Sequence, residues 1–158
     1  MSCNYRIYLD ACCLNRPFDD QTQSRISLET QAIFTILQCC QTEQWHLMNS
    51  TALATELAQM PDSERLSNVK SILAIARIKV LSSQALEDRS RNLRQLGFSV
   101  YDAAHIASAE RGCADVFLST DDRLVKRAKR HAERLQVDID NPVSWLMKSI
   151  QPEDNGKI

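Results

Sequence analysis

Residues 101–121 read YDAAHIASAERGCADVFLSTD. The first part of this stretch, residues 101–111, is rich in small residues and is followed by Gly112, a pattern that predicts a helix ending at the glycine. Residues 115–118 form a short apolar run that predicts a buried strand. An acid, Asp121, stands just beyond this run. A helix followed by a strand with an acid at its end is typical of one unit of an alternating α/β fold.

The rest of the chain repeats this alternation. Short runs of β-branched, aromatic or aliphatic residues predict strands over residues 5–9, 45–48, 78–81, 115–118 and 137–139. Apolar residues at helical spacing, or strongly charged stretches between strands, predict helices over residues 24–40, 52–60, 63–76, 83–96, 101–111, 121–135 and 142–147. The connections are long enough for crossovers, so we expect an α/β fold with a central parallel sheet in a three-layer α/β/α arrangement. This single domain is expected over residues 1–150, with a polar tail over residues 151–158.

The composition of the chain excludes several classes of protein. The chain of 158 residues carries 19 Lys and Arg against 20 Asp and Glu, a net charge of −1, which excludes a general nucleic-acid binder. No apolar run approaches the roughly 20 residues that span a bilayer, and the first residues lack the core of a signal peptide. We therefore expect no membrane association and a cytoplasmic location. The six cysteines include no C-x-x-C motif and are expected to be free thiols.

Four acids are predicted to meet at one edge of the sheet, where ligands of open α/β sheets bind. Asp10 and Asp121 lie just past two of the strands. Glu56 lies in the helix after the second strand, and Asp102 lies at the start of a helix whose N-terminal end faces the same edge. Four carboxylates together repel one another unless a cation neutralises them, and oxygen ligands suit Mg²⁺ or Mn²⁺. Taken singly, each acid is also explained as a helix cap or an exposed helix residue.

Four segments of the chain carry a resemblance to a known family. They are Ile7-Tyr8-Leu9-Asp10, residues 50–57 (STALATEL), residues 101–109 (YDAAHIASA) and Phe117-Leu118-Ser119-Thr120-Asp121. In order and spacing they resemble the PIN-domain family. The resemblance implies a parallel sheet flanked by helices and a metal-dependent ribonuclease site. It places the family's catalytic and metal-binding acids on Asp10, Glu56, Asp102 and Asp121, and its small polar residue on Ser119.

Two features depart from the commonest pattern of that family. The segment after Asp10 reads as a long loop over residues 15–20, in which Pro17 disfavours helical backbone at Arg16. The second departure is Asp122, which stands beside the fourth acid. We expect Asn15, Arg16 and Asp122 to support the site, and Arg16 and Arg25 to meet a substrate backbone.

Two further features have two interpretations each. His105 lies three residues after Asp102 and shares its helix face, where it is either a packed core histidine or a proton shuttle. Six basic residues crowd the predicted helix over residues 121–135, which is either a solvated face or an edge that contacts RNA phosphates. They are Arg123, Lys126, Arg127, Lys129, Arg130 and Arg134.

The leading hypothesis is a Mg²⁺- or Mn²⁺-dependent endoribonuclease that hydrolyses RNA. The resemblance further implies the toxin of a toxin–antitoxin pair, with a small antitoxin protein as partner, and we also consider a homodimer. The alternative is a catalytically inactive PIN-like domain that binds RNA or protein, whose signature would be the loss of an acid. An aspartyl phosphatase fits poorly, because it needs a second acid at the position of Cys12.

Overall fold

The computed structural model describes residues 4–150, so the tail expected over residues 151–158 lies outside the described residues. Five strands form one parallel sheet in the order β3-β2-β1-β4-β5. The strands are β1 (Arg6–Leu9), β2 (His46–Ser50), β3 (Ile78–Val80), β4 (Val116–Leu118) and β5 (Asp138–Asp140). The expected parallel α/β architecture is therefore confirmed.

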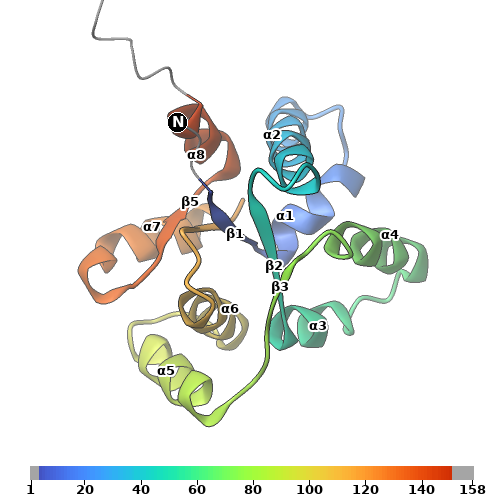
Figure 1. Cartoon of the computed structure of the whole chain (residues 1–158). Coiled ribbons are helices and arrows are strands. Elements are labelled where there is room, and N and C mark those ends of the chain that lie inside the picture. The colour runs from blue at the N-terminus through green and yellow to red at the C-terminus, as the bar shows by residue number, and fades with distance from the viewer. Residues whose placement is uncertain (1–3, 151–158) are drawn as a thin grey trace, which may run out of the picture.

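Helices cover both faces of this sheet, with α2 and α8 on one side and α5 and α6 on the other (Figure 1). The α-helices are α1 (Ala11–Asn15), α2 (Ser24–Gln41), α3 (Thr51–Leu57), α4 (Ser63–Leu73), α5 (Gln84–Gln95), α6 (Val100–Arg111), α7 (Asp122–Arg130) and α8 (Pro142–Ser149). Because both faces are covered, β1 after Arg6 and all of β4 consist of buried aliphatic and aromatic residues. Residues 7–9 of β1 and 116–118 of β4 have no exposed surface.

Polar side chains cap the starts of helices on the way to the site. Ser50 accepts a hydrogen bond from Leu53 N at the start of α3, and Asp62 accepts two from the first turn of α4. Gly97 follows the end of α5 with φ of 104°, a left-handed conformation that favours glycine. These residues thus mark where helices of the crossover connections between parallel strands begin and end.

The segment after β1 differs from the expected loop. Asp10 caps α1 directly, and a 3-10 helix, Arg16–Phe18, follows α1 without a break. Arg16 has helical dihedrals (φ −56°, ψ −38°) although Pro17 follows it, so the preference of residues before proline is overridden here. Packing explains the difference, because Cys13 and Leu14 of α1 are buried in the core. A smaller difference is that the charged helix expected over 121–135 ends at Arg130, before a 3-10 helix, Ala132–Arg134.

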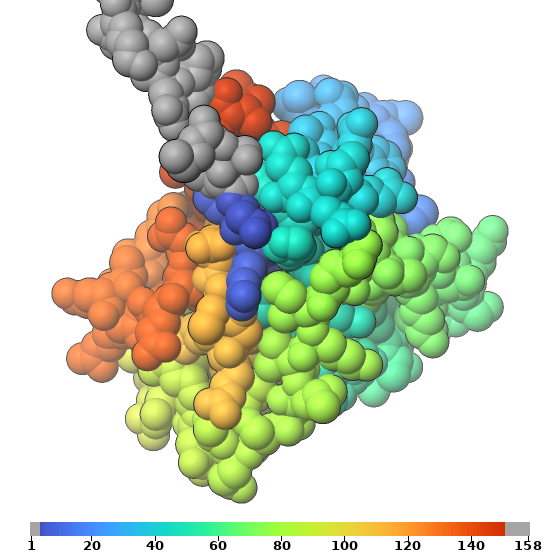
Figure 2. All heavy atoms as spheres, in the orientation of Figure 1, coloured from blue at the N-terminus to red at the C-terminus, as the bar shows by residue number. Residues whose placement is uncertain are grey.

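Figure 2 shows the face of the molecule at which the strands begin. The start of β1, in dark blue, lies between the cyan segment that precedes β2 and the orange segment that precedes β4. Backbone hydrogen bonds agree with this view, because His46 N donates to Tyr5 O and Asp115 N donates to Arg6 O. The carboxyl ends of the strands, where ligands of such sheets bind, therefore lie away from this face. No helix of the described part of the chain is long and apolar enough to span a membrane.

A buried acid ties several elements together. Glu29 of α2 is 2% exposed, and its carboxylate lies 3.0 Å from Arg16 Nε and 3.0 Å from Arg25 Nε. It also accepts a hydrogen bond of 2.8 Å from the side chain of Asn141, which caps α8. This single carboxylate thus links α2, the 3-10 helix after α1 and the start of α8.

Replacement of Glu29 by alanine is expected to destabilise the protein by about 2–3 kcal/mol, because it leaves the partly buried Arg16 guanidinium without this counter-charge and the Asn141 amide without its acceptor. The control is Glu43→Ala, which removes an ion pair with Arg77 whose two side chains are about 60% exposed. That change should cost at most about 0.5 kcal/mol. Urea unfolding of both variants checks this, and equal losses would contradict it.

Candidate active site

The first acid lies where the central strand ends. Asp10 follows β1, is 6% exposed, and accepts a 2.8 Å hydrogen bond from Ala11 N and a 2.9 Å hydrogen bond from Ser119 Oγ. The thiol of Cys12 lies 3.4 Å from the same Oδ2 that Ser119 contacts. Burial raises the pKa of the Asp10 carboxyl above its ordinary value, although His105 and Ser119 partly oppose this. Ser119, which the resemblance placed near the fourth acid, thus contacts the first acid.

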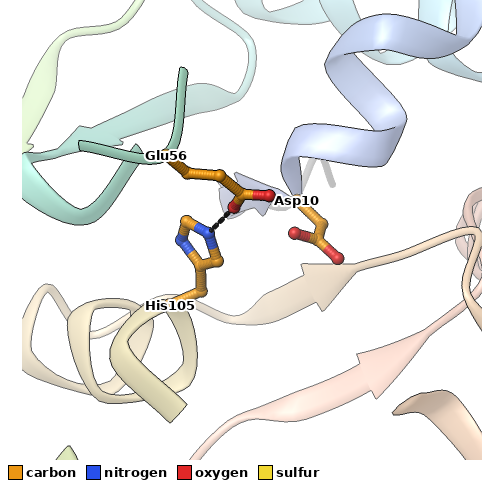
Figure 3. Close-up of side chains that lie close together, drawn as sticks. All are labelled: Asp10, Glu56 and His105. Carbon is orange, nitrogen blue, oxygen red and sulfur yellow. Dashed lines mark hydrogen bonds and ion pairs between the residues drawn. The ribbon is translucent and has the colours of Figure 1, made fainter. Parts of the chain in front are cut away.

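Glu56 reaches Asp10 from another element. It lies in the last turn of α3, and its carboxylate stands between the Asp10 carboxylate and the His105 ring (Figure 3). Ligand atoms of Asp10, Glu56 and His105 all lie within 4.8 Å of one another. His105 Nε2 is 2.5 Å from Glu56 Oε1. A strand end and two helices therefore bring one nitrogen and two carboxylate ligands together.

Asp102 lies in the first turn of α6, on the helix that carries His105. It does not cap this helix, because Ser99 accepts the hydrogen bond from Asp102 N. Burial, then the negative charges of Asp10 and Asp121, raise the pKa of the Asp102 carboxyl to about 6. Asp102 is thus within electrostatic range of two of the other acids that the sequence placed at this edge.

The fourth acid stands at the edge of the group. Asp121 is exposed and caps α7 by accepting hydrogen bonds from Arg123 N and Leu124 N. Its own backbone N–H donates to Ser119 Oγ, the hydroxyl that holds Asp10. The cap interpretation and the site interpretation of Asp121 are therefore compatible.

The supporting residues expected from the sequence lie elsewhere in the contact network. Asp122 forms a two-pronged ion pair with Arg25, at 2.7 and 2.8 Å. Arg16 is paired with Asp19 and Glu29, while Asn15 donates to Ala11 O. Arg16 and Arg25 both form ion pairs within the protein. These contacts give no support to the expectation that the two arginines meet a substrate backbone.

Sequence reasoning underestimated the histidine. His105 has no exposed surface, as expected of a packed histidine, yet it also bonds Glu56. Its spacing of three residues from Asp102 was the one signal available in the sequence. Behind it, Nδ1 lies 2.7 Å from the hydroxyl of Tyr8, a buried residue of β1 for which no sequence signal existed. Burial raises the pKa of the Tyr8 phenol well above its ordinary value of 10.0, which keeps it protonated.

The donors present suit a hard divalent cation. Among the described residues, no Lys or Arg forms an ion pair with Asp10, Glu56 or Asp102. Buried acids without a basic partner are costly, and a cation would remove that cost. Carboxylate oxygens from Asp10, Glu56 and Asp102 are the ligands that Mg²⁺ and Mn²⁺ accept.

Replacement of Asp102 by asparagine is expected to stabilise the metal-free protein near neutral pH. The Asp102 carboxyl has a pKa of about 6 in the folded state and an ordinary value of 3.8, so it stays protonated to a higher pH when the protein is folded. Wild-type stability therefore falls as pH rises from about 4 to about 6, and the loss persists above that. In EDTA at pH about 7.5 the variant should be more stable by about 1–2 kcal/mol, after allowance for partial exposure. The difference in stability between variant and wild type should nearly vanish at about pH 4. Thermal unfolding at both pH values measures it. A difference that does not change with pH would contradict the electrostatic cause.

Comparison with known proteins agrees with the fold. No curated protein matches the chain. Among solved structures, the crystal structure of PAE2754 from Pyrobaculum aerophilum is similar in fold, with a TM-score of 0.53 and 16% identity over 94% of this chain and 91% of that one. A sequence model of the PIN domain matches residues 7–130, from β1 to the end of α7. This match contains Asp10, Glu56, Asp102 and Asp121, and the chain belongs to the PIN domain family.

Proposed function

We propose that the protein is a Mg²⁺- or Mn²⁺-dependent endoribonuclease that hydrolyses phosphodiester bonds of RNA. The observation that carries this proposal is the approach of Asp10 and Glu56, whose carboxylate oxygens lie within 4.8 Å of each other at the end of β1. Asp102 and Asp121 act on the same region through their charges. Membership of the PIN family, whose members are generally nucleases, supports a hydrolase.

Each acid has a distinct part in this proposal. Asp10 and Glu56 would hold the ion, and Asp102 and Asp121 would complete one or two metal positions. A bound divalent ion supplies a nucleophilic hydroxide and neutralises charge on the phosphate as it is attacked. The hydrogen bonds of Ser119 and Ala11 N fix the orientation of the Asp10 carboxylate, so that it presents its free lone pairs to the ion.

RNA also needs contacts that hold its backbone. The basic residues of α7 and the 3-10 helix after it follow Asp121 directly in the chain, and Arg123, Lys126, Lys129, Arg130 and Arg134 are exposed. We assign the phosphates of the substrate to this surface, because such contacts position nucleic acid without reading its sequence. A net charge of −1 means that this local basic surface, not the whole protein, attracts RNA.

The same proposal includes a cellular role as the toxin of a toxin–antitoxin pair, acting on cytoplasmic RNA. A small antitoxin protein, and a second copy of the chain, are the protein partners that we propose. The family membership supports this role.

Replacement of Asp102 by asparagine should reduce RNA cleavage in Mn²⁺ by about 100-fold or more, because the site loses an anionic oxygen that would hold the ion. EDTA should abolish cleavage by the wild type. The control is Asp138→Asn, an exposed acid at the start of β5 and so at the other end of the strands; this variant should cleave at the wild-type rate. An Asp102→Asn protein that cleaves as the wild type does would refute the site.

Expression of the wild type in a bacterial host should arrest growth, whereas expression of Asp10→Asn to the same level should not, because the variant lacks the central carboxylate charge. Colony counts after induction measure this. If the wild type cleaves RNA in vitro but leaves growth unaffected, the toxin role is wrong while the ribonuclease proposal stands.

A further inference from the structure

A continuous set of hydrogen bonds runs from the middle of the sheet to the candidate site. Ser50 Oγ lies 2.7 Å from the Tyr8 hydroxyl, which lies 2.7 Å from His105 Nδ1. His105 Nε2 lies 2.5 Å from Glu56 Oε1. Ser50, Tyr8 and His105 have no exposed surface, so water does not compete for these bonds. The four residues belong to β2, β1, α6 and α3, and the chain of bonds therefore joins four separate elements.

One assignment of the hydrogens satisfies every member of this set. An ionised Glu56 carboxylate only accepts, so His105 Nε2 must donate to it. In a neutral imidazole Nδ1 is then the acceptor, and the Tyr8 hydroxyl donates to it. The Tyr8 oxygen is left to accept from Ser50 Oγ, which itself accepts from Leu53 N. Each group thus has its donor and acceptor roles filled, and the direction of the bonds fixes the tautomer of His105.

We propose that His105 is a positioning residue that holds the Glu56 carboxylate toward Asp10, and that Tyr8 and Ser50 fix the ring of His105 for that task. This inference rests on the ribonuclease proposal, because it concerns the same acids. It assigns to His105 no place among the metal ligands: both ring nitrogens are engaged within the protein.

Glu56 needs such a partner because little else restrains it. It lies in the last turn of α3, a helix of seven residues, and its side chain is 33% exposed. A free glutamate side chain populates many rotamers, and the entropy lost on ordering it opposes the binding of an ion. The short bond to a fully buried ring removes that freedom before the ion arrives. A preorganised carboxylate binds an ion more tightly for the same contact.

The arrangement also bears on which ion binds. Both ring nitrogens of His105 are hydrogen-bonded, to Tyr8 and to Glu56. The side chains left to bind the ion are therefore carboxylates, which suit Mg²⁺ and Mn²⁺. If Nε2 turned to the ion instead, the mixed nitrogen and oxygen set would favour Zn²⁺ or Ni²⁺. The positioning role of His105 therefore also withholds a nitrogen ligand that would favour Zn²⁺ or Ni²⁺.

Two substitutions at His105 separate its two bonds. Glutamine places its amide nitrogen near the position of Nε2 and keeps the donor to Glu56, whereas asparagine is shorter and reaches only the Tyr8 side. Tyr8→Phe removes the hydroxyl alone and keeps the ring, which stacks on Phe117 with centroids 5.2 Å apart. The matched control is His131→Gln, at the end of α7.

Mn²⁺ affinity of the full chain, without RNA, is measured from the free-ion signal in electron paramagnetic resonance. We expect His105→Asn to raise the dissociation constant about tenfold, and His105→Gln and His131→Gln to change it less than about threefold. Tyr8→Phe should weaken binding between these limits. Circular dichroism and thermal unfolding show which variants are folded, and Tyr8→Phe serves as the readout if His105→Asn does not fold.

Spin-echo spectra of the Mn²⁺ complex provide a second readout, because a directly bound imidazole nitrogen couples to the ion. We expect no such coupling in the wild type. A coupling that His105→Gln abolishes would make His105 a ligand and overturn the inference. The inference would also be overturned if folded His105→Asn bound Mn²⁺ as tightly as the wild type does. If His105→Asn does not fold, Tyr8→Phe takes its place in this comparison. In either case the ribonuclease proposal would stand. A wild type that binds no Mn²⁺ would overturn both.

Discussion

The site depends on the burial of a carboxylate at the end of the central strand. Asp10 stands where β1 leaves the sheet, with β2 and β4 on either side, so its position is fixed by the most buried part of the fold. Water is largely excluded there, and burial is the main cause of the raised pKa of its carboxyl. The hydrogen bonds from Ala11 N and Ser119 hold the charge in place without neutralising it. A buried carboxylate of this kind lowers the stability of the metal-free protein, and a bound cation would offset that loss.

Charges elsewhere in the molecule are arranged in the opposite way. Glu29 is as buried as Asp10 but lies between Arg16 and Arg25, and Asp122 is paired with Arg25 as well. Among the described residues, Asp10 and the acids near it contact a histidine, a hydroxyl, a thiol and backbone N–H groups, and none of them forms an ion pair with Lys or Arg. The protein thus separates paired acids, which stabilise the fold, from unpaired acids, which are available to an ion.

Much of this arrangement was predictable from local patterns, and the errors have a common cause. Strand and helix order followed from runs of apolar residues and from helical spacing, and the four acids were expected at one edge of the sheet from their positions relative to these strands and helices. Ser119 was expected near the site only from the resemblance to the PIN family. The segment 15–20 was wrongly expected to be a loop, because the burial of Cys13 and Leu14 outweighed the effect of Pro17. Arg16 and Arg25 were expected to meet the substrate because they are close to Asp10 in sequence, and that contact stays a prediction. Nothing in the sequence indicated that both form ion pairs with Glu29 of α2.

The sequence by itself determined the alternation of strands and helices and the presence of an acid at the end of each relevant element, because hydrophobic periodicity and capping act over a few residues. Only the tertiary structure decided which polar groups meet. Tyr8 and His105 are 97 residues apart in the chain, and Glu56 is 49 residues from His105. Their contact depends on the parallel order of β2, β1 and β4 and on the packing of α3 against α6. No local pattern encodes a pairing over such distances, because it arises from the way the whole sheet is covered.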